Sequence, residues 1–125
     1  MLDKIINRAE EMLEDSLLAI ERGQFRFAVD RAYLAAYHAC NLFLYPNRFG
    51  NTDFEEVLTE FNDRIISKNL LPLSFKVKFE ELAETRIEMD FGSLYDVPKE
   101  KSVMLFQYAK DFLDAAKEVL ENQPA

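Results

Sequence analysis

Residues 25–45, FRFAVDRAYLAAYHACNLFLY, decide the fold of this chain. The stretch is apolar nearly all the way round when it is wound as a helix. One of its faces carries small side chains that let a neighbouring helix approach closely, namely Ala28, Ala32, Ala35, Ala36 and Ala39. Because a helix that is apolar on all sides is normally surrounded by others, we expect residues 25–45 to form the central helix of a bundle.

Four further segments carry apolar residues at helical spacing: residues 2–22, 53–68, 74–91 and 98–121. Most of the three glycines and four prolines lie in the gaps between segments. No segment alternates between apolar and polar residues as a strand would. The sequence therefore predicts an all-α fold, an up-and-down four-helix bundle with an additional helix, five helices in total. We expect a single domain over residues 1–125, in which residues 121–125 form a frayed tail.

The last predicted helix, residues 98–121, carries more apolar surface than one packing face needs. Two stripes together cover an arc of about 180°, whereas one packing face takes roughly 100°. The stripes are Phe106, Leu113, Ala116 and Leu120, and Met104, Tyr108, Phe112, Ala115 and Val119. A second copy of the chain is the simplest candidate to cover the surplus, and a long side of the same bundle is the alternative.

The composition argues against several classes of function. Asp and Glu number 23 against 15 Lys and Arg, a net charge of −8, which disfavours RNA and anionic membranes as partners. A local basic patch of Arg31, Arg64, Lys68 and Arg86 remains compatible with that charge. The single cysteine, Cys40, and the missing targeting and membrane segments fit a cytoplasmic protein. One histidine leaves too few ligands for a metal site, and no motif indicates a cofactor.

Arg86 is the most informative residue, because on the fourth predicted helix it continues the apolar stripe of Phe79 and Leu82. An arginine on a buried face is normally paired, and Asp90 lies one turn further along that face. One interpretation is a guanidinium that Asp90 holds and directs at a phosphate or at a carboxylate of a partner. The other is a structural ion pair that fixes helix packing or a dimer.

His38 lies seven positions after Arg31 on the central helix, so both side chains point to roughly the same side. Tyr37 and Asp30 lie on that side as well. A lone histidine on such a helix is normally a hydrogen-bonded core residue. The alternative is a polar lining that His38 shares with Arg31 or Arg86.

Three pieces of sequence follow one another along the chain: Gly23-Gln24-Phe25 with Ala28 behind it, residues 31–39 (RAYLAAYHA), and residues 86–91 (RIEMDF). In order and spacing they resemble the HEPN family, small helical domains whose name abbreviates higher eukaryotes and prokaryotes nucleotide-binding. The resemblance spans most of the chain. It implies a four- to five-helix bundle that dimerises, with the arginine of the fourth helix near the dimer cleft. Many members work with a minimal nucleotidyltransferase, often as toxin and antitoxin.

The active branch of the family is a metal-independent ribonuclease, in which an arginine is followed by a histidine after four to six residues. Counted from Arg86, the corresponding positions are Phe91, Gly92 and Ser93, and none of them can exchange a proton as imidazole does. The only histidine, His38, lies on another predicted helix. The sequence therefore argues against nuclease activity.

We accordingly predict a non-catalytic, HEPN-like homodimer that binds a partner protein, with a minimal nucleotidyltransferase as the implied partner and a nucleotide as a candidate ligand. The cleft candidates are Arg86, Asp90, His38, Tyr33, Tyr37 and Arg31. Two alternatives remain open. One is a ribonuclease, the toxin of a toxin–antitoxin pair, that uses Arg86 for the phosphate and His38 as base. The other is a structural or regulatory bundle without a ligand.

Overall fold

The computed structural model describes residues 2–44, 54–69, 71–91 and 96–121. Its elements are α1 (Leu2–Glu21), α2 (Phe25–Leu44), α3 (Phe54–Phe61), the π-helical turn η1 (Asn62–Ile66), α4 (Ser74–Phe91) and α5 (Lys99–Glu121). These ranges contain no strand, so the prediction of an all-α fold with five helices is confirmed. The predicted boundaries of the four long helices agree with the observed ones to within one residue, whereas the helix predicted over residues 53–68 is divided into α3, which ends at Phe61, and η1, which ends at Ile66. The tail predicted at residues 121–125 lies outside the described ranges except for Glu121, which ends α5.

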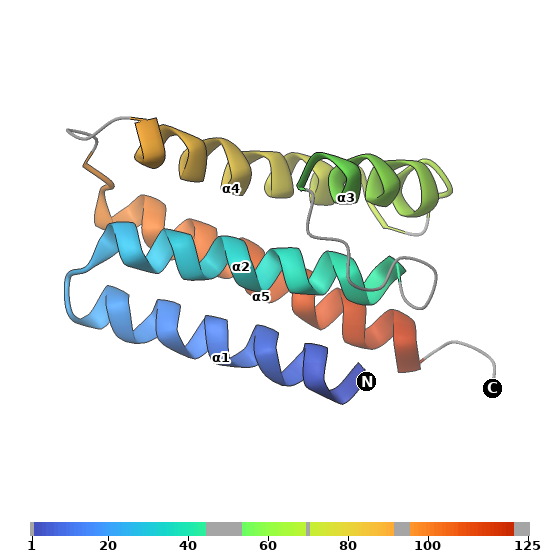
Figure 1. The fold of residues 1–125 in the computed structure, drawn as a ribbon, viewed down its shortest axis with the longest axis horizontal. Coiled ribbons are helices and arrows are strands. Elements are labelled where there is room, and N and C mark those ends of the chain that lie inside the picture. The colour runs from blue at the N-terminus through green and yellow to red at the C-terminus, as the bar shows by residue number, and fades with distance from the viewer. Residues whose placement is uncertain (1, 45–53, 70, 92–95, 122–125) are drawn as a thin grey trace.

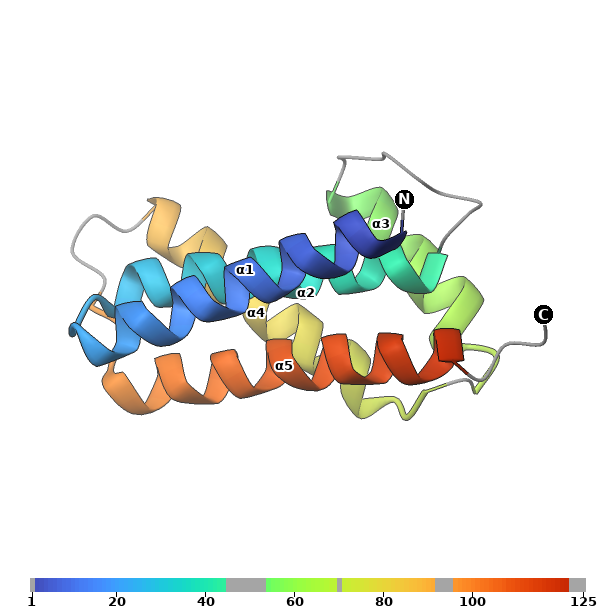
Figure 2. The same cartoon turned by 90° about the horizontal axis from the view of Figure 1, so that it is seen from below.

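The four long helices run alternately up and down (Figure 1). In that view α4 lies above α2 and α1 lies below it, while α5 lies behind α2. Figure 2 separates α5 from α2 and shows that α4 crosses the other long helices obliquely. The short α3 and η1 together form the additional element, and they pack on α2 and α4 respectively. The start of α2 and the end of α4 therefore lie at the same end of the bundle.

Helix α2 is the central helix, as its sequence predicts. It contacts each of the other four α-helices, and its five alanines are completely buried. The small side chains let α1 approach closely enough that the buried Ser16 hydroxyl on α1 donates a hydrogen bond of 2.7 Å to the Ala28 carbonyl oxygen. That bond satisfies a buried polar group that would otherwise destabilise the helix pair.

The turn between α1 and α2 is closed by a glycine that adopts a left-handed conformation. Gly23 has a φ of 75°, and the amide of Gln24 donates to the Ala19 carbonyl oxygen at 2.8 Å. The amide of Gly23 itself donates to Ile20. This pair of bonds is the Schellman motif, which ends a helix and reverses the chain within a few residues.

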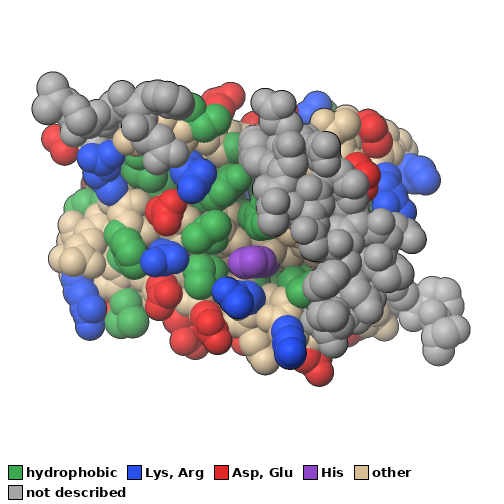
Figure 3. Space-filling view, in the orientation of Figure 1, with side chains coloured by type: hydrophobic (Ala, Val, Ile, Leu, Met, Phe, Trp, Pro, Cys, Tyr) green, Lys and Arg blue, Asp and Glu red, His purple; other side chains and the backbone are tan. Residues whose placement is uncertain are grey.

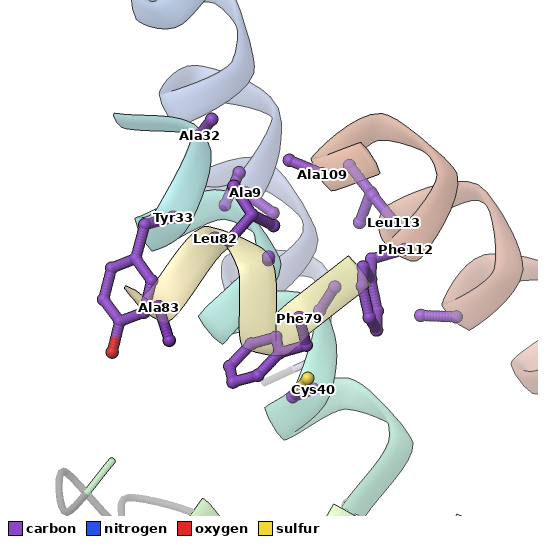
Figure 4. Close-up of a cluster of buried hydrophobic side chains, with 14 of the residues drawn as sticks. Ala9, Ala32, Tyr33, Cys40, Phe79, Leu82, Ala83, Ala109, Phe112 and Leu113 are labelled. Atoms are coloured by element: carbon purple, nitrogen blue, oxygen red, sulfur yellow. The ribbon is translucent and has the colours of Figure 1, made fainter. Parts of the chain in front are cut away.

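The core is built around aromatic rings from three elements. Phe112 of α5 lies 5.8 Å from Phe61, 5.7 Å from Phe79 and 5.2 Å from Phe75, measured between ring centroids. Figure 4 shows the rings of Phe79 and Phe112 in this cluster, with the sulfur of Cys40 close by. Cys40 is completely buried, and burial raises the pKa of its thiol well above the ordinary value. These contacts hold α3, α4 and α5 together on one side of α2.

The wide apolar arc of α5 is shared among three neighbours within the chain. Helix α5 contacts α2, α1 and α4. On one flank Lys117 pairs with Glu10 of α1 at 2.7 Å, and on the other Asp111 pairs with Lys78 of α4 at 3.3 Å. The apolar residues of the second stripe pack against the core: Met104, Tyr108, Phe112, Ala115 and Val119. These contacts favour the alternative of a long side of the same bundle for this arc, and a second copy stays a prediction.

Candidate functional site: the α2 face and Arg86

Arg86 joins α4 to α2 rather than bonding only within its own helix. Its Nε donates to Oδ1 of Asp30 at 3.1 Å. Its guanidinium carbon also lies 4.8 Å from the centroid of the Tyr33 ring, in a cation–π contact. Asp30 and Tyr33 are three positions apart on α2, so one helical turn of α2 presents both groups to the same arginine. Together they fix the direction in which the guanidinium points.

The expectation that Arg86 lies on a buried face needs correction. Its side chain is 37% exposed, and so is that of Asp30. Because the antiparallel α2 and α4 meet at their flanks, the guanidinium sits at the edge of their contact and reaches solvent. The predicted partner Asp90 has a side chain outside the described part of the chain, and the pairing of Arg86 with Asp90 stays a prediction.

Tyr33 is buried against the core, and its ring lies 6.2 Å from that of Phe79. In Figure 4 its hydroxyl points away from the centre of the cluster. Burial raises the pKa of Tyr33 to about 12, although the positive charge of Arg86 lowers it in part. Tyr33 therefore stays a neutral phenol near pH 7 and does not act as a base beside Arg86.

A second arginine ties the same ends of the two helices. Arg26 at the start of α2 donates from Nη2 to the Met89 carbonyl oxygen at 2.7 Å. Met89 lies in the last turn of α4, where carbonyl groups have no partner within the helix. Arg26 thus caps the C-terminus of α4 and holds the helix end that carries Arg86.

Arg31 lies on the opposite flank of α2, next to α1. Its guanidinium carbon lies 4.5 Å from the centroid of the Phe27 ring, and its Nη1 lies 3.8 Å from the sulfur of Met12 on α1. Its Nε is fully buried and has no hydrogen-bond acceptor. The structure therefore separates Arg31 from Arg86, which the sequence analysis had grouped as cleft residues.

His38 is half-buried on the same flank as Arg31, and its ring packs edge-on against that of Tyr37, with centroids 5.8 Å apart. Burial lowers the pKa of His38, and the positive charge of Arg8 on α1 lowers it further. His38 follows Asp30 by eight positions, about 12 Å along α2 at a rise of 1.5 Å per residue. Within one chain the imidazole is therefore not beside the group that Arg86 would bind.

Asp30, Arg31 and His38 belong to one surface of α2, which we call the α2 face. It consists of the α2 side chains that lie exposed or half-buried between α1 and α4: Phe27, Asp30, Arg31, Leu34, Tyr37, His38 and Asn41. They recur at intervals of three and four, so they form a single stripe along the helix. In Figure 3 the histidine lies near the centre of the view, with basic and apolar side chains beside it and acidic side chains further below and to the left.

Sequence reasoning did not identify Asp30 as the partner of Arg86, or Arg26 as the cap of α4. The separations in sequence are 56 and 63 residues, so no local spacing could have found either contact. The only signal was that Asp30 shares a helix side with the other candidates.

Two open pockets in the described ranges lie elsewhere, one lined by Asn62 to Leu73 around the η1–α4 turn and one around Gly23 to Phe27. Neither is lined by Arg86.

Within the described ranges no cluster of His, Cys, Asp and Glu is arranged to hold a metal ion. In the same ranges, no helix has both the length and the apolar character that a membrane span requires.

Comparison with known proteins relates the chain to two distant relatives. No protein-family model matches it. A "UPF0332 protein" of Thermotoga maritima is 24% identical over 115 residues, which cover 92% of this chain and 87% of that protein. "Putative toxin MJ0142" of Methanocaldococcus jannaschii is 25% identical over 119 residues, which cover 95% of this chain and 81% of that protein. The chain is thus similar over nearly its whole length to a protein named as a toxin, while membership of the HEPN family stays a prediction.

Proposed function

We propose that this protein is a non-catalytic binding module in a two-protein pair of the toxin–antitoxin type. It engages its partner through the α2 face, with Arg86 as the anchor for an anionic group. The resemblance to HEPN domains supports the finer statements that it acts as a homodimer, that the partner is a nucleotidyltransferase, and that a nucleotide phosphate is the anion. The similarity to a protein named as a toxin supports the pair itself.

The observation that carries this proposal is the way in which Arg86 is held. Asp30 fixes Nε at 3.1 Å and the Tyr33 ring supports the guanidinium plane, yet 37% of the side chain remains exposed. A guanidinium that is oriented before binding loses little conformational freedom when it meets a phosphate or a carboxylate. Because part of the side chain reaches solvent, a ligand can approach the guanidinium without displacing Asp30 or Tyr33.

The ribonuclease alternative gains no support from the groups around Arg86. Hydrolysis or transesterification of RNA without a metal needs an acid and a base within hydrogen-bond reach of the reacting atoms. Tyr33 has a pKa of about 12, and Asp30 already accepts from Arg86. His38, the single histidine of the chain, lies about 12 Å further along α2. These distances and protonation states favour binding over catalysis.

Native mass spectrometry of the purified protein with and without ATP tests the proposal. We expect a dimer with an ATP adduct for the wild type and loss of the adduct in Arg86→Ala. Arg64→Ala is a matched control, because Arg64 is also paired within 4 Å, with Glu60, and its side chain is 38% exposed. The control should keep the adduct. An adduct that survives Arg86→Ala would contradict Arg86 as the anchor.

Two further measurements test the pair and the lack of catalysis. Co-expression with a nucleotidyltransferase encoded beside this chain should yield a complex that survives size-exclusion chromatography and that Arg86→Ala weakens. Incubation with labelled single-stranded RNA should leave the RNA intact. Cleavage that disappears in both Arg86→Ala and His38→Ala would overturn the proposal in favour of the ribonuclease.

A further inference from the structure

Arg31 is a charged residue whose hydrogen bonds the described part of the chain does not satisfy. Its Nε is fully buried without an acceptor, and its Nη1 meets only the weakly accepting sulfur of Met12 at 3.8 Å. Among the described residues no carboxylate lies within 4.0 Å of it. A buried donor without a partner costs free energy, and the cost is larger when the group is charged. Nη2 of Arg31 is not enclosed in this way, so an acceptor supplied from outside the chain can pair with the guanidinium there.

Two other arginines beside the α2 face also have no carboxylate within 4.0 Å in the described ranges. Arg8 on α1 is exposed near His38, and Arg26 donates only to the Met89 carbonyl oxygen. Arg8, Arg26 and Arg31 thus lie along or beside the α2 face without a carboxylate partner in the described ranges, while the single acid of that face, Asp30, accepts from Arg86. Three such cations favour an acidic ligand.

The same face offers apolar surface at helical spacing. Phe27 is 44% exposed and carries the Arg31 guanidinium on its ring, and Leu34 is half-buried two turns further on. From Phe27 to Asn41 the stripe covers 14 steps along α2, about 21 Å at 1.5 Å per residue. Helices α1 and α4 flank it on both sides (Figures 1 and 3). An amphipathic helix laid along a flanked apolar stripe is a common mode of recognition between proteins.

We propose that the α2 face docks an acidic amphipathic helix of the partner protein, with one of its carboxylates paired to Arg31. This inference rests on the proposed function and names the chemistry of the partner. The Phe27 ring holds the guanidinium in a plane, which favours the two parallel hydrogen bonds that a carboxylate accepts from arginine. The apolar residues of the partner helix would cover Phe27 and Leu34.

Two other occupants fit the same face less well. A second copy laid face to face would offer Arg31 and Arg8 only one kind of carboxylate from its α2 face, that of Asp30, which already accepts from Arg86. A single-stranded RNA would meet the field of an acidic protein with net charge −8, and its phosphates would find the cations separated by apolar surface. A protein helix uses both the cations and the apolar side chains.

A selection from displayed random peptides of about 14 residues, the length of the stripe, tests the inference with the full-length protein as bait. We expect the enriched peptides to be acidic with apolar residues at helical spacing. In fluorescence anisotropy, Arg31→Gln should weaken their binding at least about tenfold, and Arg8→Gln should weaken it to a smaller extent. Arg64→Gln, on the distant η1 turn, is the matched control and should leave binding unchanged. Circular dichroism confirms that each variant is folded, and Arg8 is exposed, so its variant keeps the test decisive should Arg31→Gln unfold.

The outcomes separate this inference from the proposed function. Enriched peptides that are neutral or basic, or that bind Arg31→Gln as tightly as the wild type, would overturn it, as would a selection that enriches nothing. If Arg86→Ala abolishes the ATP adduct while Arg31→Gln has no effect on peptides, the proposed function stands and the acidic helix fails. A labelled oligouridylate that binds more tightly than the peptides and depends on Arg31 would replace the acidic helix by RNA.

Discussion

Removing the contact between Arg86 and Asp30 measures how far that contact stabilises the fold. The paired atoms lie 3.1 Å apart, but both side chains are 37% exposed, so water screens their attraction. Pairs of this kind contribute about 0.2–1 kcal/mol to the free energy of unfolding. The cation–π contact with Tyr33 at 4.8 Å adds about 0.5–1 kcal/mol. We therefore expect Arg86→Ala to lower the free energy of unfolding by about 1–2 kcal/mol.

Urea unfolding followed by circular dichroism, applied to both single variants and the double variant, gives the coupling energy between Arg86 and Asp30. We expect a coupling of about 0.5–1 kcal/mol. The exposed pair Lys110–Asp114 on α5, at 3.5 Å, is a reference and should couple by about 0.3–0.5 kcal/mol. A loss above about 3 kcal/mol for Arg86→Ala, or a coupling above about 2 kcal/mol, would show a structural ion of the buried type. Either result would refute the reasoning that Arg86 is available to a ligand.

Three further predictions concern the core and the α2 face. Because the folded-state pKa of His38 is lowered by burial and by Arg8, the unfolded state binds more protons below about pH 6.5. The contribution of His38 to the free energy of unfolding is therefore complete above that pH and is lost as the pH falls through the folded-state pKa. In urea titrations at several pH values, His38→Gln should reduce the dependence of the free energy of unfolding on pH. An unchanged dependence would contradict this prediction. Cys40 should resist thiol reagents in the native protein and react only at the rate of unfolding, because it is completely buried and the pKa of its thiol is raised. Rapid labelling under native conditions would contradict its burial. Phe112→Ala should lower the free energy of unfolding by about 3–5 kcal/mol, because the ring is completely buried among three others; a loss below about 1 kcal/mol in thermal or urea unfolding would show that the cluster is not packed as described.

The helices and the central place of α2 could be predicted because both depend on local patterns. Apolar residues at intervals of three and four determine which side of a helix is buried, whichever neighbour covers it. Gly23 marked the end of α1 for an equally local reason, since its φ of 75° is easily adopted only by a residue without a side chain. Because apolar residues lie on nearly all sides of residues 25–44, the helix that they form is stable only when other helices surround it.

The arc of α5 shows where such reasoning ends. From the sequence, a second copy was the simplest candidate to cover this arc, and a long side of the same bundle was the alternative. The choice depended on the oblique crossing of α4, which brings Lys78 to Asp111 while Lys117 reaches Glu10 on the other flank. A crossing angle results from how side chains of two helices interlock, and neither helix contains that information alone.

By itself, the sequence determined the helices, the burial of the α2 alanines, and the presence of one arginine that interrupts an apolar stripe on α4. Only the tertiary structure decided that Arg86 meets Asp30 and Tyr33, that Nε of Arg31 has no acceptor among the described residues, and that His38 lies away from Arg86. The physical reason is the range of the interactions involved. Helical periodicity is set by hydrogen bonds four residues apart, whereas contacts between helices depend on their relative rotation and axial offset, which the whole core determines together.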